Sequence, residues 1–481
     1  MYILYSMINL KEFRKYAHQL ADWMADYYQN IEDYPVKSNV KPGDIFNSLP
    51  DLPPSEGESM DKILMDFQFG ILPGITHWQH PNFFAYFTAN TSYPSILAEM
   101  LTTAMASQCM IWETSPAAAE LEEKVMNWLR SMIGLPSNFE GVIQDTASTS
   151  TLVAILTARE RYTDYSINEK GFTGTEKLRL YCTPETHSSI EKGVKIAGLG
   201  RTNLVRVEVD EKLAMKSDKL REAIEFDLKQ GFKPFFVVAT LGTTGTLAID
   251  PLNSIAQICE EFKLWLHVDA AFAGTALVLP ENRWMTIGVE QADSFVFNPH
   301  KWMFTNFDCS AYYVKDKEAL LRTFEILPEY LKTRTRGEVN DYRDWGIQLG
   351  RRFRALKLWF VIRNFGVEGI KEKVREHIKI AKSLADKIRN SEDFILFEPQ
   401  YLSVVCFRYQ PSQKSNIEEI NQLNQNLLHK LNESGKIYLT HTKVHGMITL
   451  RMVIAQTNVE KKHVDRAWEL IQKTAKTLGA F

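Results

Sequence analysis

The sequence predicts an α/β fold built on a mostly parallel β-sheet, with a smaller α+β domain after it. From residue 141 onward, short runs rich in β-branched and aromatic residues alternate with stretches of helical periodicity. Such alternation favours a parallel sheet with helices on both faces. We expect three parts: an N-terminal helical arm over residues 1–90, a large domain over 91–360, and a small C-terminal domain over 361–481.

Composition places the chain among ordinary globular proteins. Of its 481 residues 45% are hydrophobic, and 56 basic against 59 acidic residues give a formal net charge of -3. The sequence contains no block of five like charges, so its charge pattern does not indicate a nucleic-acid or anionic-membrane partner. No apolar run reaches the roughly 18 residues that a membrane span requires. Five widely spaced cysteines without a C-x-x-C pair argue against a disulfide framework and a zinc ribbon, so we expect a cytoplasmic protein without a metal.

The N-terminal arm is predicted from a helical pattern with little core of its own, so we expect it to pack on another domain or another subunit. A polar, proline-containing stretch from Asp33 to Glu58 follows it and is typical of an extended segment. The first ten residues, MYILYSMINL, lack the basic region and cleavage site of a signal peptide, and we interpret them as a short extension. The apolar positions at helical spacing are Phe13, Ala17, Leu20, Met24 and Tyr27.

The large domain is predicted from seven strand-like runs. Helical stretches at 148–162, 188–199, 217–229 and 253–262 separate them. In sheets of this kind, ligands bind at the carboxyl ends of the strands, which tells us where to look for a site. The predicted strands are GVIQ (141–144), LRLYC (178–182), NLVRVEV (203–209), PFFVVAT (234–240), LWLHVD (264–269), SFVFN (294–298) and SAYYV (310–314).

The C-terminal domain follows a long helical pattern near 353–365 that ends at Gly366. The rest of the chain predicts, in order, a helix, the runs FILFE (394–398) and LSVVCFRY (402–409), a helix at 416–432, a strand pair near 437–453 and a last helix from 459.

A carboxylate, Asp269, ends one of the buried strands of the large domain. The small residues Ala270, Ala271, Ala273 and Gly274 follow it, and they would let a flat ring lie close to the backbone. A carboxylate at a strand end can pair with a protonated ring nitrogen. Taken alone, Asp269 is better explained as an ordinary strand-end aspartate.

A lysine, Lys301, follows the next strand in the segment SFVFNPHKW, which also contains Asn298 and His300. It would lie at the same edge of the sheet as Asp269. Burial and neighbouring cations lower the pKa of a lysine, which makes its amine nucleophilic enough to form a Schiff base. A lone lysine would be a solvated surface residue, but its spacing from His-Val-Asp-Ala-Ala argues against that explanation.

These segments resemble a known family. HVDAAFAG (267–274) and NPHKWMFTNFDCSAYYV (298–314) are similar to the group II decarboxylases that use pyridoxal 5'-phosphate (PLP), and most of all to the aromatic-L-amino-acid decarboxylases. The resemblance covers essentially the whole chain, and a motif series in this order is very specific. The further matching segments are THWQHPNFFAYF (76–87), SPAAAELE (115–122), GVIQDTAS (141–148), HSSIEKG (187–193), ATLGTTGT (239–246) and DYRDWGIQLGRRFRALKLWFV (341–361).

The resemblance implies a PLP enzyme of fold type I, a homodimer whose active sites lie at the subunit interface. Lys301 would hold the cofactor as a Schiff base and Asp269 would pair with its pyridine nitrogen. Thr146, Ala147 and Ser148 resemble the phosphate cradle at a helix N-terminus, although a Ser/Thr cluster alone would indicate an N-capping loop. The remaining positions that match cofactor contacts are Asn298, His300 and Thr244.

Two further positions match residues of the family that act on the reacting carbon. His187 matches the imidazole that stacks on the pyridine ring and assists proton transfer. Tyr330 lies in the charged segment PEYLKTRTRGE (328–338), which is typical of a mobile loop. It matches the tyrosine that protonates Cα after CO2 leaves. Relatives that make aldehydes tend to lack the tyrosine or the histidine, so their presence here favours simple decarboxylation.

The substrate pocket shows departures from the relatives. Ala89 follows Thr88 where animal enzymes acting on catechols more often have Pro-Thr, so a hydroxyl for a phenolic substrate is missing. Gly350 stands where relatives that prefer histidine or tyrosine tend to have serine, and its small size favours an indole. We therefore favour tryptophan over phenylalanine, tyrosine and DOPA. The other pocket positions are Trp78, Tyr86 and Phe87, which form an apolar aromatic wall, and Gln108 and Met110, expected from the neighbouring subunit, whose effect we do not predict.

Other functions fit the sequence less well. There is no P-loop motif, and GLGRTN (198–203) is a poor dinucleotide fingerprint because it follows a helical pattern. The pairs His77/His80 and His441/His445 lack the carboxylate or cysteine partners of a metal site. An aminotransferase or desulfurase of the same fold would anchor its substrate differently and lack the loop tyrosine. A catalytically dead scaffold is disfavoured because Lys301, Asp269, His187 and Tyr330 are all present.

Overall fold

The computed structural model describes residues 8–174, 176–326, 338–411 and 416–479. At the centre of these residues lies a sheet of seven strands: β1 (Glu140–Gln144), β2 (Leu178–Cys182), β3 (Leu204–Arg206), β4 (Lys233–Thr240), β5 (Trp265–Asp269), β6 (Ser294–Phe297) and β7 (Ser310–Val314). Their order is β1-β7-β6-β5-β4-β2-β3. β7 is antiparallel to both neighbours, and the pairs from β6 to β3 are parallel. The predicted mostly parallel sheet is confirmed, and the carboxyl ends of every strand except β7 meet at one edge.

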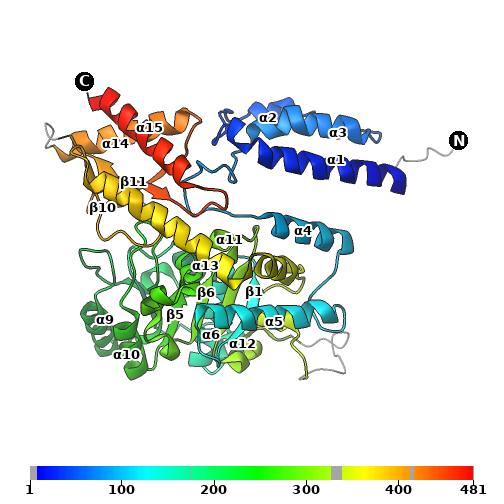
Figure 1. Ribbon diagram of the computed structural model, residues 1–481. Coiled ribbons are helices and arrows are strands. Elements are labelled where there is room, and N and C mark those ends of the chain that lie inside the picture. Colours follow the sequence, from blue (N-terminus) through cyan, green and yellow to red (C-terminus); the bar gives the residue numbers. More distant parts are fainter. Residues whose placement is uncertain (1–7, 175, 327–337, 412–415, 480–481) are drawn as a thin grey trace.

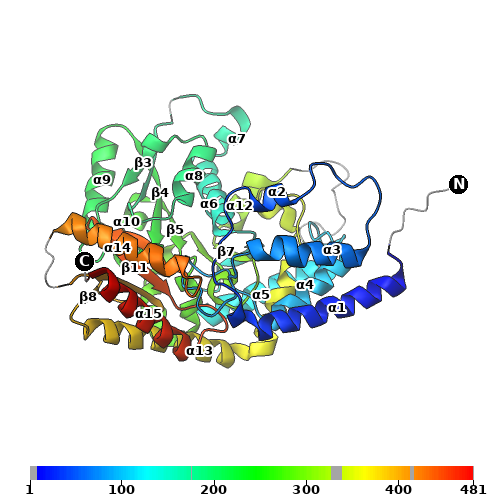
Figure 2. The same ribbon diagram turned by 90° about the horizontal axis from the view of Figure 1, so that it is seen from above.

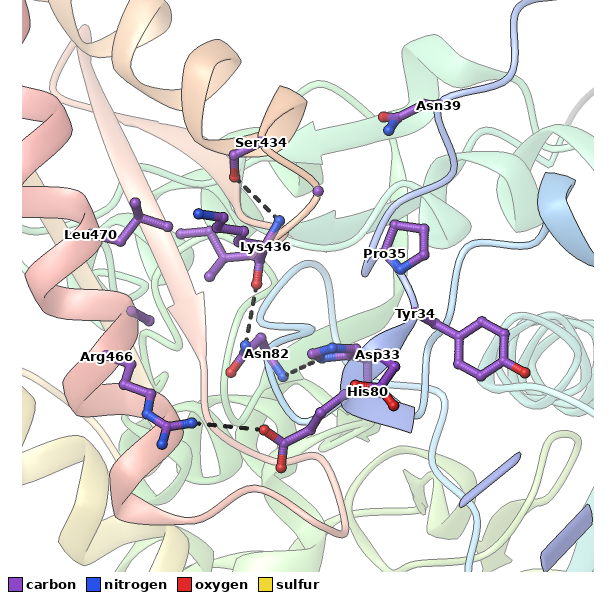
Figure 3. Close-up of a pocket in the computed structure, with 14 residues that line it drawn as sticks. Asp33, Tyr34, Pro35, Asn39, His80, Asn82, Ser434, Lys436, Arg466 and Leu470 are labelled. Carbon is purple, nitrogen blue, oxygen red and sulfur yellow. Dashed lines mark hydrogen bonds and ion pairs between the residues drawn. The ribbon is translucent and has the colours of Figure 1, made fainter. Parts of the chain in front are cut away.

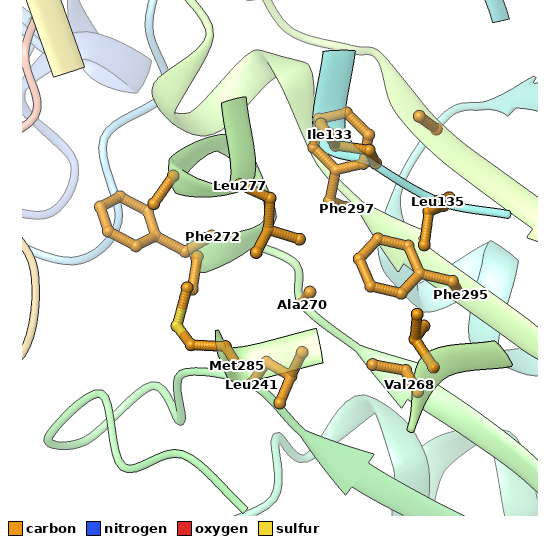
Figure 4. Close-up of a cluster of buried hydrophobic side chains, with 14 of the residues drawn as sticks. Ile133, Leu135, Leu241, Val268, Ala270, Phe272, Leu277, Met285, Phe295 and Phe297 are labelled. Atoms are coloured by element: carbon orange, nitrogen blue, oxygen red, sulfur yellow. The ribbon is translucent and has the colours of Figure 1, made fainter. Parts of the chain in front are cut away.

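Helices cover both faces of this sheet, as expected for strands buried on both sides. They are α5 (Pro116–Ile133), α6 (Ala147–Tyr162), α7 (Ser166–Lys170), α8 (Ser189–Ile196), α9 (Ser217–Lys229), α10 (Leu252–Phe262), α11 (Pro299–Trp302) and α12 (Lys317–Phe324). One hydrophobic core joins the sheet to α5, α9 and α10, and a second core joins the opposite face to α6, α8 and α12. Figure 4 shows part of the first core, where Phe295 and Phe297 of β6 pack beside Ile133 and Leu135.

The C-terminal domain is an antiparallel sheet backed by helices. Its elements are α13 (Arg354–Arg389), β8 (Phe394–Leu396), β9 (Val404–Tyr409), α14 (Ile417–Glu433), β10 (Thr440–Val444), β11 (Met447–Val453) and α15 (Lys461–Gly479). The strand order is β10-β11-β9-β8. In Figure 1, α13 runs along the boundary between this domain and the large domain. Its backbone is non-helical at Gly366, where φ is 67°, a value that glycine adopts without strain.

The N-terminal arm consists of α1 (Leu10–Gln29), α2 (Asp44–Ser48) and α3 (Met60–Asp66), followed by α4 (Tyr93–Met105). A capping box formed by Asn9 and Glu12 starts α1. The stretch from Asp33 to Glu58 was expected to be extended because of its prolines, but it contains the short helix α2. The arm projects to one side of the sheet (Figure 2), and Phe13 and Leu20 of its apolar pattern are exposed. None of the helices in the described ranges combines the length and apolarity that a membrane span requires.

Candidate active site

The carboxyl edge of the sheet brings together side chains that are far apart in the sequence. Asp269 is the last residue of β5, and its neighbours in register are Thr240 of β4 and Val296 of β6. Lys301 lies on α11, immediately beyond β6. His187 follows β2, and it interacts electrostatically with both Asp269 and Lys301. Asp269 and Lys301 therefore lie at the same edge, as expected from the sequence, and His187 joins them there.

The Lys301 amine lies in an apolar and partly cationic environment. Its Nζ is 4.9 Å from the centroid of the Phe87 ring. Loss of solvent lowers the pKa of Lys301 to about 8; the Asp269 carboxylate acts in the opposite direction, and the Arg451 guanidinium lowers the pKa further. A substantial fraction of this amine is thus neutral near pH 8, as a nucleophilic lysine requires.

Asp269 is buried, with 4% of its surface exposed, and its Oδ1 accepts a hydrogen bond from the backbone N–H of Ala271 at 3.0 Å. Of the four small residues after it, Ala270, Ala273 and Gly274 are buried in the core, whereas Ala271 is half-buried, and the expected approach of a flat ring stays a prediction. A Cβ on Gly274 would lie 2.4 Å from Cβ of Phe297, and Ala270 and Ala273 are fully buried. These positions are small because the core packs against them, as Figure 4 shows for Ala270 and Phe297.

The His187 ring is held in one orientation. Its Nδ1 accepts a hydrogen bond from the backbone N–H of Ser189 at 3.2 Å and lies 2.8 Å from the Ser189 hydroxyl. The proton of the neutral imidazole is therefore on Nε2. Desolvation lowers the pKa of His187; the Asp269 carboxylate opposes this shift, and the Lys301 cation adds to it. His187 is exposed to solvent.

The N-terminus of α6 can bind an anion. Thr146 is its N-cap residue, but the Thr146 side chain makes no capping hydrogen bond. Within the described residues, the N–H groups of Ala147 and Ser148 have no acceptor, since the first N–H groups of a helix have no partner inside the helix. Free N–H groups and the helix dipole together favour a phosphate. Ser148 and Thr244 are both exposed, and each follows the carboxyl end of a strand.

Asn298 and His300 hold the turn that carries Lys301. Asn298 Oδ1 accepts a hydrogen bond from the Ser310 hydroxyl at 2.7 Å, and His300 Nδ1 accepts one from the backbone N–H of Cys309 at 2.8 Å. Burial, the largest cause, lowers the pKa of His300 to about 3, so its ring is neutral. The two side chains bind the start of β7 and the residue before it, and sequence reasoning had assigned them only to the cofactor.

The aromatic wall is split into two groups. The Phe87 ring stacks on Phe272 with 4.2 Å between centroids and lies below Lys301. Trp78 and Tyr86 stack on each other at 5.8 Å, and the Tyr86 hydroxyl lies 3.3 Å from that of Tyr438. The backbone carbonyl of Ala89, two residues after Phe87, accepts a hydrogen bond from Gln79 Nε2 at 2.7 Å. Phe87 is thus the wall residue that contacts the Lys301 amine.

Three predicted pocket residues lie elsewhere in the single chain. Gln108 Oε1 accepts a hydrogen bond from the backbone N–H of Arg351 at 2.7 Å, and a Cβ on Gly350 would lie 3.2 Å from Gln108 Nε2. The Met110 carbonyl accepts from the N–H of Arg343 at 2.9 Å. Among the described residues, no hydrogen bond joins this group to Lys301. A side chain at position 350 would therefore meet the Gln108 amide, and the preference for an indole at this position stays a prediction.

Two residues that sequence reasoning missed hold or face Lys301. Asn90 is buried, and its Nδ2 donates to the Lys301 carbonyl at 2.9 Å and to the Ala455 carbonyl at 2.7 Å. Arg451 is 3% exposed, and its guanidinium lies 4.7 Å from the Phe87 centroid. Arg451 Nη1 donates to the Tyr86 carbonyl, whereas its Nε and Nη2 have no hydrogen-bond partner in the described part of the chain. The sequence signal that could have identified Arg451 is a charged residue inside the otherwise apolar strand MITLRMV.

Tyr330, the predicted catalytic tyrosine, lies outside the described residues.

Away from the predicted site lies a pocket of about 540 Å³, and none of the predicted site residues lines it. It lies between the arm and the C-terminal domain (Figure 3). Glu32 Oε2 lies 3.8 Å from the Arg466 guanidinium, and Asn82 Nδ2 donates to the Lys436 carbonyl at 3.2 Å. These contacts join the arm to the C-terminal domain of the same chain.

Comparison with known proteins identifies the family. The model of the pyridoxal-dependent decarboxylase conserved domain matches residues 42–410. The chain is 41% identical to phenylacetaldehyde synthase of Arabidopsis thaliana, over 98% of this chain and 97% of the relative, and 41% identical to tryptophan decarboxylase 2 of Oryza sativa, over 98% and 96%. The structure of Catharanthus roseus tryptophan decarboxylase with L-tryptophan superimposes with a TM-score of 0.92 at 39% identity, over 98% of this chain and 99% of that one. The fold is thus PLP fold type I, and this chain belongs to the pyridoxal-dependent decarboxylase family, whose cofactor is PLP.

Proposed function

We propose that the protein decarboxylates an aromatic L-amino acid to the corresponding amine and CO2, with tryptophan favoured over phenylalanine, tyrosine and DOPA. The observation that carries this proposal is the meeting of Lys301, Asp269 and His187 at one sheet edge beside the Phe87 ring. The names of the relatives support an aromatic substrate, since they include a tryptophan decarboxylase, a tyrosine decarboxylase and a phenylacetaldehyde synthase.

The residues present fit PLP. The free N–H groups at the start of α6 suit its phosphate, the buried carboxylate of Asp269 suits its pyridine nitrogen, and the partly neutral amine of Lys301 suits its aldehyde. Asn298, His300 and Thr244 complete the proposed set. When bound, PLP accepts the electron pair that remains at Cα after CO2 leaves.

The protein's own residues have distinct tasks in this proposal. Asp269 would keep a proton on the ring nitrogen of bound PLP, and Lys301 would hold the cofactor through its amine. His187 would cover one face of the ring, and its Nε2–H would be available to the reacting atoms because Ser189 occupies its Nδ1. Tyr330 delivers the proton to Cα and helps to exclude water.

Arg451 is suited to bind the substrate carboxylate. Its guanidinium is buried beside Phe87 and Lys301, and two of its nitrogens lack partners among the residues that the structure describes. Leaving such a group unpaired is costly, and a carboxylate is the usual bidentate partner of arginine. Binding there would fix the substrate with its side chain along the aromatic wall.

A second activity is favoured by one specific observation. Phenylacetaldehyde synthase from Arabidopsis thaliana is as similar to this chain as the rice tryptophan decarboxylase. Such an enzyme would consume O2 and water and release aldehyde, CO2, ammonia and hydrogen peroxide. Because Tyr330 and His187 are both present, we retain decarboxylation to the amine as the proposed reaction.

We further propose that the enzyme is a cytoplasmic homodimer whose division into residues 1–90, 91–360 and 361–481 follows the sequence prediction. An apolar groove of about 440 Å³ between α1 and α4 supports an interface on the arm, with exposed Tyr93, Leu97 and Met100 along one side. Gln108 and Met110 lie just beyond α4 and would enter the partner's active site. The five cysteines are all free, as in a reducing compartment.

The lowered pKa of Lys301 predicts a specific pH profile for cofactor loading. Because only the neutral amine attacks, the rate at which apoenzyme forms its covalent link with PLP should rise with pH and level off above about pH 8, rather than near 10.5. Nα-acetyl-lysine, measured in parallel, corrects for the titration of PLP itself. Asp269→Asn removes a charge that raises the pKa, so its midpoint should be lower. A wild-type midpoint near 10.5 would contradict the assignment.

Tyr330→Phe should redirect the products. Without the phenol, Cα is not protonated promptly and reacts with O2, so aldehyde, peroxide and ammonia should replace most of the amine. Mass spectrometry of products from tryptophan, phenylalanine, tyrosine and DOPA measures this change, and Tyr27→Phe on the arm is the matched control. Unchanged products in Tyr330→Phe would refute its role.

Gln108 and Gly350 should together determine how large an aromatic side chain the substrate pocket accepts. Gln108→Ala should raise kcat/KM for tryptophan relative to phenylalanine, and Gly350→Ser should lower it by pushing the amide into the pocket, each by about tenfold or less. In a mixed dimer of Lys301→Ala and Gln108→Ala chains, the one site with Lys301 should receive Gln108 from its partner and show wild-type selectivity. Variant selectivity in that mixed dimer would show that Gln108 does not act across the interface.

A further inference from the structure

Three aromatic rings from three separate segments form a column that begins below Lys301, and a fourth ring, from another segment, lies beside the last of them. Phe87 stacks on Phe272 with 4.2 Å between centroids and 8° between planes, and Phe272 stacks on Trp302 at 4.8 Å and 5°. The plane of His377 lies within 9° of that of Trp302, with 6.4 Å between centroids. Figure 4 shows Phe272 within the hydrophobic core that supports the column. The column therefore fixes the plane of Phe87 from below.

The last two rings are joined by a hydrogen bond rather than by face contact. Trp302 Nε1–H donates to His377 Nδ1 at 3.0 Å, and both side chains are fully buried. Burial, the largest cause, lowers the pKa of His377 to about 3, so the ring is neutral and Nδ1 remains an acceptor at physiological pH. Among the described residues, its Nε2 has no hydrogen-bond partner. A leucine would fill this space without an unpaired N–H, so the bond to Trp302 is what explains a histidine here.

His377 lies where α13 passes from one core to another. Ile370 and Val374 belong to the core of the large domain, whereas Ile380 and Leu384 belong to the core of the C-terminal domain. The hydrogen bond of His377 therefore ties Trp302, the residue next to Lys301, to the helix that connects the two domains.

The backbone of Lys301 is thus held from two directions. On one side Asn90 donates to its carbonyl at 2.9 Å, and on the other Trp302 is fixed by His377. We propose that His377 is a positioning residue, which acts through Trp302 to set the place of the Lys301 amine and through the ring column to set the plane of Phe87. This inference rests on the proposed function for its effect on the reaction rate.

The test compares His377→Leu, which removes the acceptor at similar volume, with His377→Asn, whose Oδ1 can accept at the position of Nδ1. In His377→Leu we expect kcat to fall on the order of 10-fold to 100-fold with KM nearly unchanged, as for a displacement of about 1 Å or less. The absorbance of the bound cofactor should titrate at a shifted pH. His377→Asn should restore most of both properties. Trp302→Phe should match His377→Leu, and the double variant should add nothing further.

The matched control is Trp265→Phe, which removes another buried indole hydrogen bond, to Ser294 at 2.9 Å, at the far end of β5. It should leave the kcat and the cofactor titration at wild-type values. If His377→Leu or Trp302→Phe folds with a wild-type cofactor titration and kcat, or if His377→Asn behaves like His377→Leu, the positioning role is wrong. If the wild-type enzyme releases no amine, the proposed function fails, but the cofactor titration still decides the role of His377.

Discussion

The loss of solvent around the Lys301 amine, offset in part by the Asp269 carboxylate, is the constraint on which the rest of this site depends. An amine in water would be almost wholly protonated at neutral pH, whereas here burial lowers its pKa to about 8. Without Asp269 the desolvation would go uncompensated, and without burial the amine would not be nucleophilic. The two residues meet because β5 and β6 are parallel neighbours whose carboxyl ends lie at the same edge.

The surrounding architecture keeps this arrangement rigid on one side and open on the other. Below Lys301, the ring column and the hydrogen bond of Asn90 fix its backbone and the Phe87 wall. Above it, His187 and the start of α6 remain exposed and can receive the cofactor. The N-terminal arm and the residues near Gln108 leave apolar and polar surfaces that a second subunit would cover.

Much of the fold could be predicted from the sequence, because its strands read as short apolar runs that alternate with amphipathic helices. The edge that carries Asp269 and Lys301 followed from the rule for parallel sheets, whereas the approach of His187 to them is seen only in the structure. What could not be predicted depends on tertiary packing. The partner of Gly350 is Gln108, more than 240 residues away. The role of Asn90 depends on its contact with the Lys301 carbonyl, and the role of His377 depends on its contact with Trp302. Nothing in the local sequence of either residue indicates these contacts.

The most direct test of this account is to reduce the PLP-loaded enzyme with borohydride, digest it and locate the pyridoxyl group by mass spectrometry. The account predicts that the group is on Lys301 and that Lys301→Ala incorporates none. A pyridoxyl group on any other lysine, or full incorporation in Lys301→Ala, would contradict it.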